Sequence, residues 1–383
     1  MISAFTTVPK LVFGAGSIES LENEVPALGG SRVMLITDAG VLNTGAADRV
    51  ADVVKKSGID VKVFHEVEPE PSAEIVHKVK EVAQAFGADL LIGLGGGSCL
   101  DVAKAASVLM TNPGAIWDYF GVDKVPKPGI PVVAIPTTAG TGSEVTSISV
   151  LVDPRDQLKK GVVSPHLFAR LSVLDPVLTL ELPPRLTALT GLDALVHAVE
   201  SFTGIHASPF TDAMNGKAIE LIGKNLRKAV FQGSDLKARE AMLYASCMAG
   251  MAFSNTQNGL AHALALALGS KYHLPHGLST AIMLPWVMRY NLGANLEKFA
   301  KVACLLGTQT RSDNVTDLAR VSVRLIEELL EDLEISFQLK HYGVKEKDFE
   351  LLAKQAMSAK RLVENNPRRP SEEDIVRLLQ RAY

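Results

Sequence analysis

The chain has 383 residues, 47% of them hydrophobic, which is enough for two domains with a large buried core. A net charge of −3 without a long basic run argues against a nucleic-acid partner. The three cysteines form no CxxC motif, and the sequence shows neither a secretory signal at its start nor an apolar run long enough to span a membrane. We therefore expect a cytoplasmic protein that is not bound to a membrane.

Short β-branched runs alternate with amphipathic helical stretches over about the first 180 residues. This alternation predicts a mostly parallel sheet with helices packed against it. We expect buried strands at residues 32–37, 61–64, 90–94 and 132–135, and helices at residues 73–86 and 100–109.

Strand signals end near Leu182, and alanine- and leucine-rich helical patterns take over, as at residues 235–253 and 318–333. The Pro183-Pro184 pair marks the expected boundary. The sequence thus predicts an α/β domain over residues 1–181 and an all-α domain over residues 182–383.

A glycine loop, Gly95-Gly96-Gly97-Ser98, follows the strand expected at residues 90–94. Glycines let backbone N–H groups approach a phosphate closely. Ser98 and Asp101 have the spacing of a capping box, which predicts that a helix begins here. A helix N-terminus after a glycine loop favours a pyrophosphate, although a plain tight turn between strand and helix has the same pattern.

A second loop, residues 136–144, follows the strand expected at residues 132–135 and is dense in hydroxyl groups and small residues. This composition suits hydrogen bonds to ribose, phosphate and amide groups, and it is equally typical of a solvated loop. The hydroxyl residues that we single out are Thr137, Thr138, Thr141 and Ser143.

A partial dinucleotide fingerprint at residues 14–19 ends in Glu19 instead of glycine, which makes it a weak signal. Asp38 nevertheless closes an expected strand 22 residues after Gly16, near the spacing at which that fingerprint has its ribose-binding acid. We interpret Asp38 as an acceptor for the adenosine ribose 2′-hydroxyl and residues 95–98 as the pyrophosphate site. Because a carboxylate repels a 2′-phosphate, this favours NAD(H) over NADP(H).

Asp193 and His197 lie four residues apart in a helical stretch, so both side chains leave one face of the helix. Such a pair can bind one divalent cation, although a helix-capping aspartate and an unrelated histidine give the same spacing. His262 lies in an almost wholly apolar run, where an imidazole needs a hydrogen bond or a metal. His276 lies on a turn between proline and glycine. One carboxylate and three imidazoles suit Fe(II), Zn(II), Co(II) or Mn(II).

The stretches 190–200 and 259–277 resemble, in order and spacing, the two metal signatures of the iron-containing (group III) alcohol dehydrogenases. The resemblance runs from about Phe13 to about Pro370. It implies a Rossmann-like N-terminal domain and a helical C-terminal domain, a fold that this family shares with dehydroquinate synthase. It also implies that the iron ligands are Asp193, His197, His262 and His276.

The same resemblance implies that both loops bind NAD, so that residues 1–181 are the dinucleotide-binding domain and residues 182–383 hold the metal and the substrate. It also matches Lys159 to a lysine near the cofactor, where a solvated surface lysine is equally typical. The expected cofactor-binding residues are Asp38, Gly95, Gly96, Gly97, Ser98, Asp101, Thr137, Thr138, Thr141, Ser143 and Lys159.

The implied reaction is reversible hydride transfer between NAD(H) and a small alcohol or aldehyde. The cation would act as a Lewis acid on the substrate oxygen, with His262 and His276 as its catalytic ligands. Iron is the implied metal, and zinc or another divalent ion stays open.

Three positions bear on the substrate. Leu266 replaces a histidine that many family members carry four residues after the one matching His262. This leaves the proton path open to His273, or to water and the cofactor ribose. Ile148 stands where some relatives have asparagine. Both changes make the pocket, which Phe253 is also expected to line, less polar. We therefore expect substrates with apolar or extended tails in preference to diols.

Three alternative functions share some of these features. A non-redox enzyme like dehydroquinate synthase, or one like maleylacetate reductase, would need clustered basic groups near the metal, where the sequence supplies only Lys271. A non-catalytic binding protein would not need four intact ligands. Because the helical part has apolar surface to spare, we expect a homodimer or a larger homo-oligomer.

Overall fold

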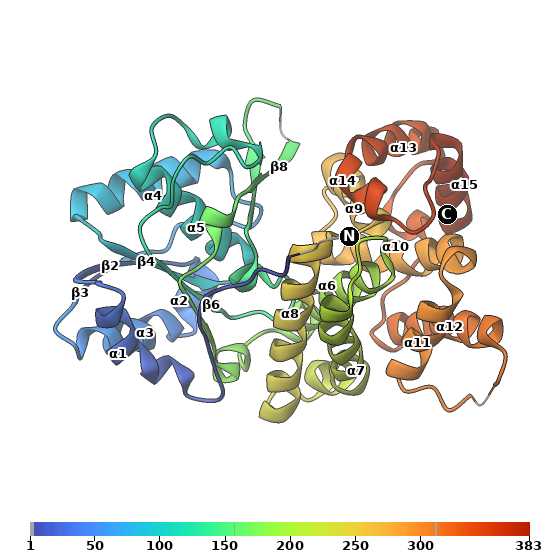
Figure 1. The fold of residues 1–383 in the computed structure, drawn as a ribbon, viewed down its shortest axis with the longest axis horizontal. Coiled ribbons are helices and arrows are strands. Elements are labelled where there is room, and N and C mark those ends of the chain that lie inside the picture. The colour runs from blue at the N-terminus through green and yellow to red at the C-terminus, as the bar shows by residue number, and fades with distance from the viewer. Residues whose placement is uncertain (1–3, 157, 311) are drawn as a thin grey trace. The chain divides into compact units, whose positions relative to one another are not determined.

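The computed structural model describes residues 4–156, 158–310 and 312–383 (Figure 1). It divides into two compact units. One, the sheet unit, comprises Thr6–Leu182, and the other, the helical unit, comprises Pro183–Tyr383 together with the start of the chain.

The sheet unit is built on six parallel strands in the order β1-β9-β6-β4-β2-β3. The prediction of a mostly parallel sheet is therefore confirmed. The strands are β1 (Leu11–Phe13), β2 (Arg32–Ile36), β3 (Asp60–Phe64), β4 (Leu90–Gly95), β6 (Val132–Pro136) and β9 (Leu171–Leu174).

Helices cover both faces of this sheet, as Figure 1 shows. Alternate residues of β2 and β4 point to opposite faces. Val33 and Leu35 pack on one face with the helices before and after β2, while Gly93 lies on the other. A Cβ at Gly93 would come within 2.9 Å of the Ala103 Cβ, so this glycine lets the helix after β4 pack closely. The helices of the unit are α1 (Leu21–Ala27), α2 (Ala39–Asn43), α3 (Ala46–Lys55), α4 (Ala73–Phe86) and α5 (Gly97–Thr111).

The same unit contains a small second sheet of three strands, which the sequence did not predict. Its central strand pairs antiparallel with one edge strand and parallel with the other. The strands are β5 (Gly121–Val122), β7 (Ile148–Asp153) and β8 (Leu158–Val163), in the order β5-β8-β7.

The helical unit surrounds α6 (Pro184–Thr203), whose residues from Thr187 to Thr203 are buried almost without exception. Pro184 occupies the first turn, where its missing N–H costs no hydrogen bond. No helix among the described residues is long and apolar enough to cross a membrane. The other helices are α7 (Pro209–Phe231), α8 (Leu236–Thr256), α9 (Leu260–Tyr272), α10 (His276–Asn291), α11 (Leu296–Leu305), α12 (Val315–Asp332), α13 (Phe349–Ser358), α14 (Lys360–Asn365) and α15 (Glu372–Ala382).

Candidate metal centre and cofactor loops

Three side chains converge inside the helical unit. Asp193 comes from α6, His262 from the first turn of α9, and His276 from the first residue of α10. One ligand atom from each lies within 4.8 Å of the other two. The Asp193 Oδ1 atom is 3.9 Å from His262 Nε2 and 3.8 Å from His276 Nε2. Two donors bound at about 2.1 Å to one tetrahedral cation lie roughly 3.4 Å apart, so a small inward movement of these groups suffices to bind an ion.

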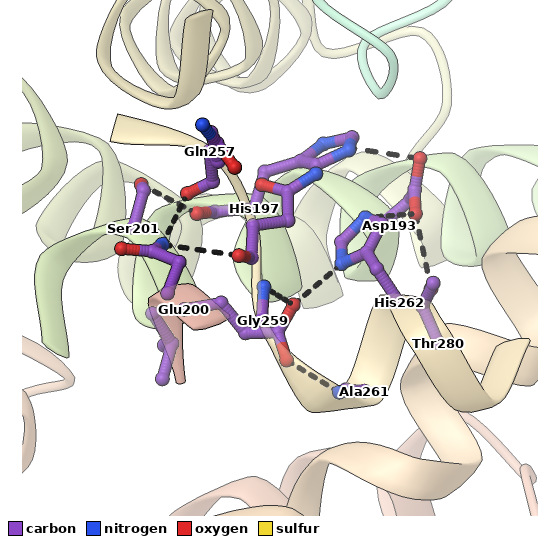
Figure 2. A network of polar contacts seen from close by, with 12 residues as sticks. Asp193, His197, Glu200, Ser201, Gln257, Gly259, Ala261, His262 and Thr280 are labelled. Atoms are coloured by element: carbon purple, nitrogen blue, oxygen red, sulfur yellow. Dashed lines mark hydrogen bonds and ion pairs between the residues drawn. The ribbon is translucent and has the colours of Figure 1, made fainter. Parts of the chain in front are cut away.

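His262 carries the clearest sign that a metal belongs here. The residue is 4% exposed, and its Nδ1 atom lies 2.6 Å from Glu200 Oε2 (Figure 2). The Nε2 atom, on the side of Asp193, has no hydrogen-bond partner among the described residues. A buried imidazole nitrogen without a partner is costly, and a divalent cation would use its lone pair. The residues therefore fit the metal that their pattern implies.

Asp193 is held in place by α10. Thr280 donates a hydrogen bond from Oγ1 to Asp193 Oδ1 at 3.0 Å, as Figure 2 shows. The two helices approach closely at Gly277, where a Cβ would lie 2.5 Å from the Leu189 carbonyl oxygen. Only glycine permits this approach, which brings His276 to the aspartate.

His197, the fourth predicted ligand, lies beside the other three without joining that close group. Its Nδ1 atom is 3.9 Å from Asp193 Oδ2. Its ring stacks on His262 at 4.6 Å between centroids and on Phe253 at 4.4 Å. The buried Phe253 therefore covers the His197 imidazole with apolar surface, and the role of His197 as a ligand stays a prediction.

In the sheet unit, the predicted cofactor residues gather at the carboxyl ends of neighbouring parallel strands. Asp38 follows β2, the glycine loop follows β4, and the loop with Thr137 and Thr138 follows β6. The connections from β2 and β4 run in opposite directions across the sheet, since β2 leads to β3 and β4 to β6. Ligands of open α/β sheets bind at such a reversal of strand order.

The backbone around Gly95 is compatible with a close ligand. Gly95 has φ of +148°, and a Cβ there would lie 2.6 Å from Cys99 Sγ and 3.4 Å from Asp38 Oδ2. Asp38 caps α2, since its Oδ1 accepts from the Val41 N–H at 2.9 Å. The ribose acid and the phosphate loop proposed from the sequence are therefore neighbours.

A helix begins near Ser98 as predicted, but the prediction that Ser98 and Asp101 form a capping box is wrong. The helix begins at Gly97, Gly96 is the N-cap, and no side chain caps it. The reason is that Asp101 turns inward: its Oδ1 accepts from Ser143 Oγ at 2.5 Å and its Oδ2 from the Val150 N–H at 2.8 Å.

This contact belongs to a buried network that the sequence did not reveal. Lys104 is 1% exposed, lies 3.1 Å from Asp101 Oδ1, and donates to Ser143 Oγ at 2.7 Å and to the Ile148 carbonyl. Burial lowers the pKa of Lys104 and raises the pKa of the neighbouring Glu144 to about 7. The network joins α5 to the hydroxyl-rich loop. Asp101 and Ser143 therefore support the loop, and their contact with a cofactor stays a prediction.

The partial fingerprint at residues 14–19 and the side chain of Lys159 both contact acidic residues of the sheet unit. The N–H groups of Gly16 and Ile18 donate to the Asp175 carboxylate at 3.1 and 3.3 Å. These N–H groups of the partial fingerprint are therefore bonded to a side chain of the protein. Lys159 forms an ion pair with Glu70 at 2.6 Å. Its role at a cofactor stays a prediction.

Two of the predicted substrate-pocket residues, Ile148 and Leu266, are partly buried, whereas Phe253 is buried. Ile148 opens β7, and Leu266 lies in the middle of α9. His273 is exposed at the C-cap of α9 with φ of +53°, which is consistent with a surface histidine. Lys271 is also exposed, in the last turn of that helix.

Sequence reasoning missed Glu200 and Thr280, which contact His262 and Asp193. A signal for Glu200 was present, because residues 193, 197 and 200 follow an i, i+4, i+7 pattern on one helix face. A charged residue in that buried stripe needs a partner.

Sequence comparison agrees with this geometry. Residues 9–176 match the profile described as iron-containing alcohol dehydrogenase, and residues 187–383 match that of the Fe-containing alcohol dehydrogenase family, C-terminal. The chain belongs to the iron-containing alcohol dehydrogenase family. The resemblance inferred from the two metal signatures is thereby confirmed.

Several related proteins align with nearly the whole chain. The chain is 46% identical over 376 residues to a sulfoacetaldehyde reductase of Bilophila wadsworthia (strain 3_1_6), covering 98% of this chain and 97% of that one. The structure of a 1,3-propanediol oxidoreductase has a TM-score of 0.98 at 38% identity over 100% of both chains. A sulfoacetaldehyde reductase from Bifidobacterium kashiwanohense in complex with NAD+ has a TM-score of 0.91 at 28% identity, covering 100% of this chain and 99% of that one. This iron-containing alcohol dehydrogenase is an oxidoreductase that acts on alcohols or aldehydes.

Proposed function

We propose that this protein reduces a small aldehyde, and oxidises the corresponding alcohol, with NAD(H) and a divalent metal. The observation that carries the proposal is the convergence of Asp193, His262 and His276 around a buried imidazole nitrogen without a partner. A bound cation supplies Lewis acidity to the substrate oxygen, and the nicotinamide supplies or accepts the hydride. Iron is the family's metal, and the same ligand set also suits zinc.

The residues of the chain have separate tasks in this proposal. Asp193 supplies the negative charge of the metal site, and His197, His262 and His276 supply neutral nitrogen donors. Thr280 orients the aspartate, and Phe253 keeps water from the His197 imidazole.

The cofactor would bind at the carboxyl edge of the sheet. Asp38 would accept from the ribose 2′-hydroxyl, and the residues around Gly95 would receive the pyrophosphate. The NAD+ complex of the related sulfoacetaldehyde reductase supports this choice of cofactor.

We consider two candidate substrates, an aldehyde with an apolar or extended tail and sulfoacetaldehyde. The apolar Ile148 and Leu266 favour aldehydes with apolar or extended tails over diols. The 46% identity to a sulfoacetaldehyde reductase favours sulfoacetaldehyde as a second candidate. A screen that follows NADH absorbance on iron- or zinc-loaded protein should separate them by kcat/KM for butanal, 3-hydroxypropanal and sulfoacetaldehyde.

The variant His262→Ala tests the division of tasks. It should abolish metal binding and turnover while NAD(H) binding, measured by fluorescence titration, stays near that of the unmodified protein. The matched control is His273→Ala, which removes an exposed imidazole from the same helix and should keep the metal. The proposal is refuted if His262→Ala keeps metal and turnover, or if no aldehyde supports NADH oxidation by loaded protein.

We also propose a homo-oligomer in a reducing compartment. Large apolar side chains are exposed on the helical unit, including Ile205 at 58%, Phe210 at 71% and Phe231 at 63%. The free and exposed thiol of Cys304 suits a reducing cytoplasm. Light scattering on purified protein measures the assembly, and a monomeric mass would contradict that part of the proposal.

A further inference from the structure

We propose that Glu200 is a positioning residue that fixes His262 in the tautomer with its proton on Nδ1, which keeps Nε2 free to bind the metal. This inference rests on the metal site proposed above and deepens it. The carboxylate is not itself part of the close ligand group, since it reaches His262 from the opposite side of the ring.

The Glu200 carboxylate contacts two backbone N–H groups and the His262 ring. Its Oε2 atom accepts from the Gly259 N–H at 2.8 Å and lies 2.6 Å from His262 Nδ1, and its Oε1 atom accepts from the Ala261 N–H at 2.5 Å (Figure 2). Glu200 is 5% exposed, so water does not compete for these positions. Both carboxylate oxygens already accept from backbone N–H groups, so the Oε2 atom is placed to accept a further hydrogen, the one on His262 Nδ1.

The other neutral tautomer of His262 would lose the Glu200 hydrogen bond without forming another at Nε2. It would turn the Nδ1 lone pair toward a carboxylate oxygen at 2.6 Å. It would also point an Nε2–H toward Asp193 Oδ1 at 3.9 Å, which is too far for a hydrogen bond. The Glu200 contact therefore selects the ring form whose lone pair faces Asp193. Metal-binding histidines in general donate their second N–H to such a partner, which sets the tautomer and the ring orientation.

The same carboxylate anchors the helix that carries His262. Gly259 is the N-cap of α9 and has no side chain to satisfy the first N–H groups. Glu200 does so from α6, and its charge lies at the positive end of the helix dipole. A Cβ at Gly259 would lie 3.0 Å from Glu200 Oε1, so glycine leaves room for this contact.

The turn before Gly259 is also held under strain. Gln257 has φ of +76° and ψ of 166°, a region that residues other than glycine rarely adopt. Asn365 donates from Nδ2 to the Gln257 carbonyl at 2.9 Å and to the Asn258 carbonyl at 3.0 Å. The start of α9 is thus fixed from two sides, by Asn365 and by Glu200, which sets where the His262 ring stands.

The variant Glu200→Gln tests the proposal with little change of shape. A glutamine amide has one oxygen and one NH2 group, so in either orientation the NH2 faces an N–H donor of this site. We expect the dissociation constant for Zn(II), measured by chelator competition on the full chain, to rise about 10- to 100-fold. The matched control is Thr203→Val, a near-isosteric change at a buried position of α6 whose hydroxyl donates to the Val199 carbonyl. The control should bind zinc as tightly as the unmodified protein.

A second measurement can be made on the unmodified protein as well as on the variant. Two-bond ¹H–¹⁵N NMR spectra of ¹⁵N-histidine-labelled full chain, above the ordinary imidazole pKa of about 6.5, report the tautomer of each ring. We expect His262 in the Nδ1–H form with zinc and after its removal, and we expect Glu200→Gln to populate the Nε2–H form.

The outcomes separate this inference from the proposed function. A metal-free protein with His262 in the Nε2–H form overturns the role of Glu200, as does a Glu200→Gln variant with unchanged zinc affinity. If the unmodified protein binds no divalent metal, the proposed function fails, while the tautomer of His262 still decides what Glu200 does.

Discussion

The close approach of α10 to α6 makes Gly277→Ala a sharp test of how the centre is assembled. The added Cβ would start 2.5 Å from the Leu189 carbonyl oxygen and 3.1 Å from its carbonyl carbon, which are backbone atoms that cannot rotate away. An ordinary contact of about 3.4 Å or more requires the start of α10 to move by nearly 1 Å. Such overpacking costs about 1–3 kcal/mol of stability. Metal sites tolerate only about 0.5 Å of displacement, so His276 should lose its ligand position.

The assay compares zinc affinity by chelator competition and thermal stability in the same samples. Gly277→Ala should fold, melt at a lower temperature and bind zinc at least about tenfold more weakly, because one of the proposed ligands is displaced. Gly293→Ala is the control, since it lies in the same unit and a Cβ there meets no atom within 4 Å. Zinc affinity equal to that of the unmodified protein in Gly277→Ala would show that His276 is not needed, and the proposed geometry would be refuted.

Two further predictions concern the sheet unit. The pKa of Glu144 is raised to about 7 by burial, against 4.5 ordinarily, so the folded chain binds this proton more tightly than the unfolded chain. The associated stability is present below about pH 4.5 and lost as the pH rises through 7, which amounts to about 3 kcal/mol. Urea unfolding should show Glu144→Gln gaining stability relative to the unmodified protein between about pH 5 and pH 8, and a constant difference would contradict the buried carboxyl. The variant Asp38→Asn keeps an oxygen for capping α2 but loses the negative charge. The KM for NADH should therefore rise about tenfold, and the preference for NADH over NADPH should shrink. Unchanged kinetics with both cofactors would show that Asp38 does not bind the ribose.

Much of the fold could be predicted because local periodicity reflects it. The run at residues 73–86 is the whole of α4, and the strands expected at residues 90–94 and 132–135 fall within β4 and β6. The strands that the sequence missed either pair with a distant part of the chain or lack a clear strand pattern. β1 has three residues and pairs with β9, about 160 positions away, and β8 contains two lysines and a glycine, which weaken any strand pattern.

In the candidate site, too, local spacing could be predicted from the sequence, whereas contacts between distant residues could not. Spacing within one helix predicted Asp193 and His197, because i and i+4 always share a face. It could not show that Glu200 meets the start of α9, since that contact joins residues about 60 positions apart. The capping role assigned to Ser98 failed for a related reason, because a distant hydroxyl on Ser143 takes up the Asp101 carboxylate.

The conformation of Gln257 has a consequence for how the centre comes apart. Keeping a residue with a side chain in that backbone region costs about 1–3 kcal/mol, within a total stability of only about 5–15 kcal/mol for a typical domain. The hydrogen bonds from Asn365 to the Gln257 and Asn258 carbonyls offset that cost while the fold is intact. Once heat or denaturant frees Asn365, the peptide at Gln257 relaxes toward ordinary angles and carries the first turn of α9 with it. Release of the ion on heating should then precede melting of the helices, with the turn before α9 as the first point to yield.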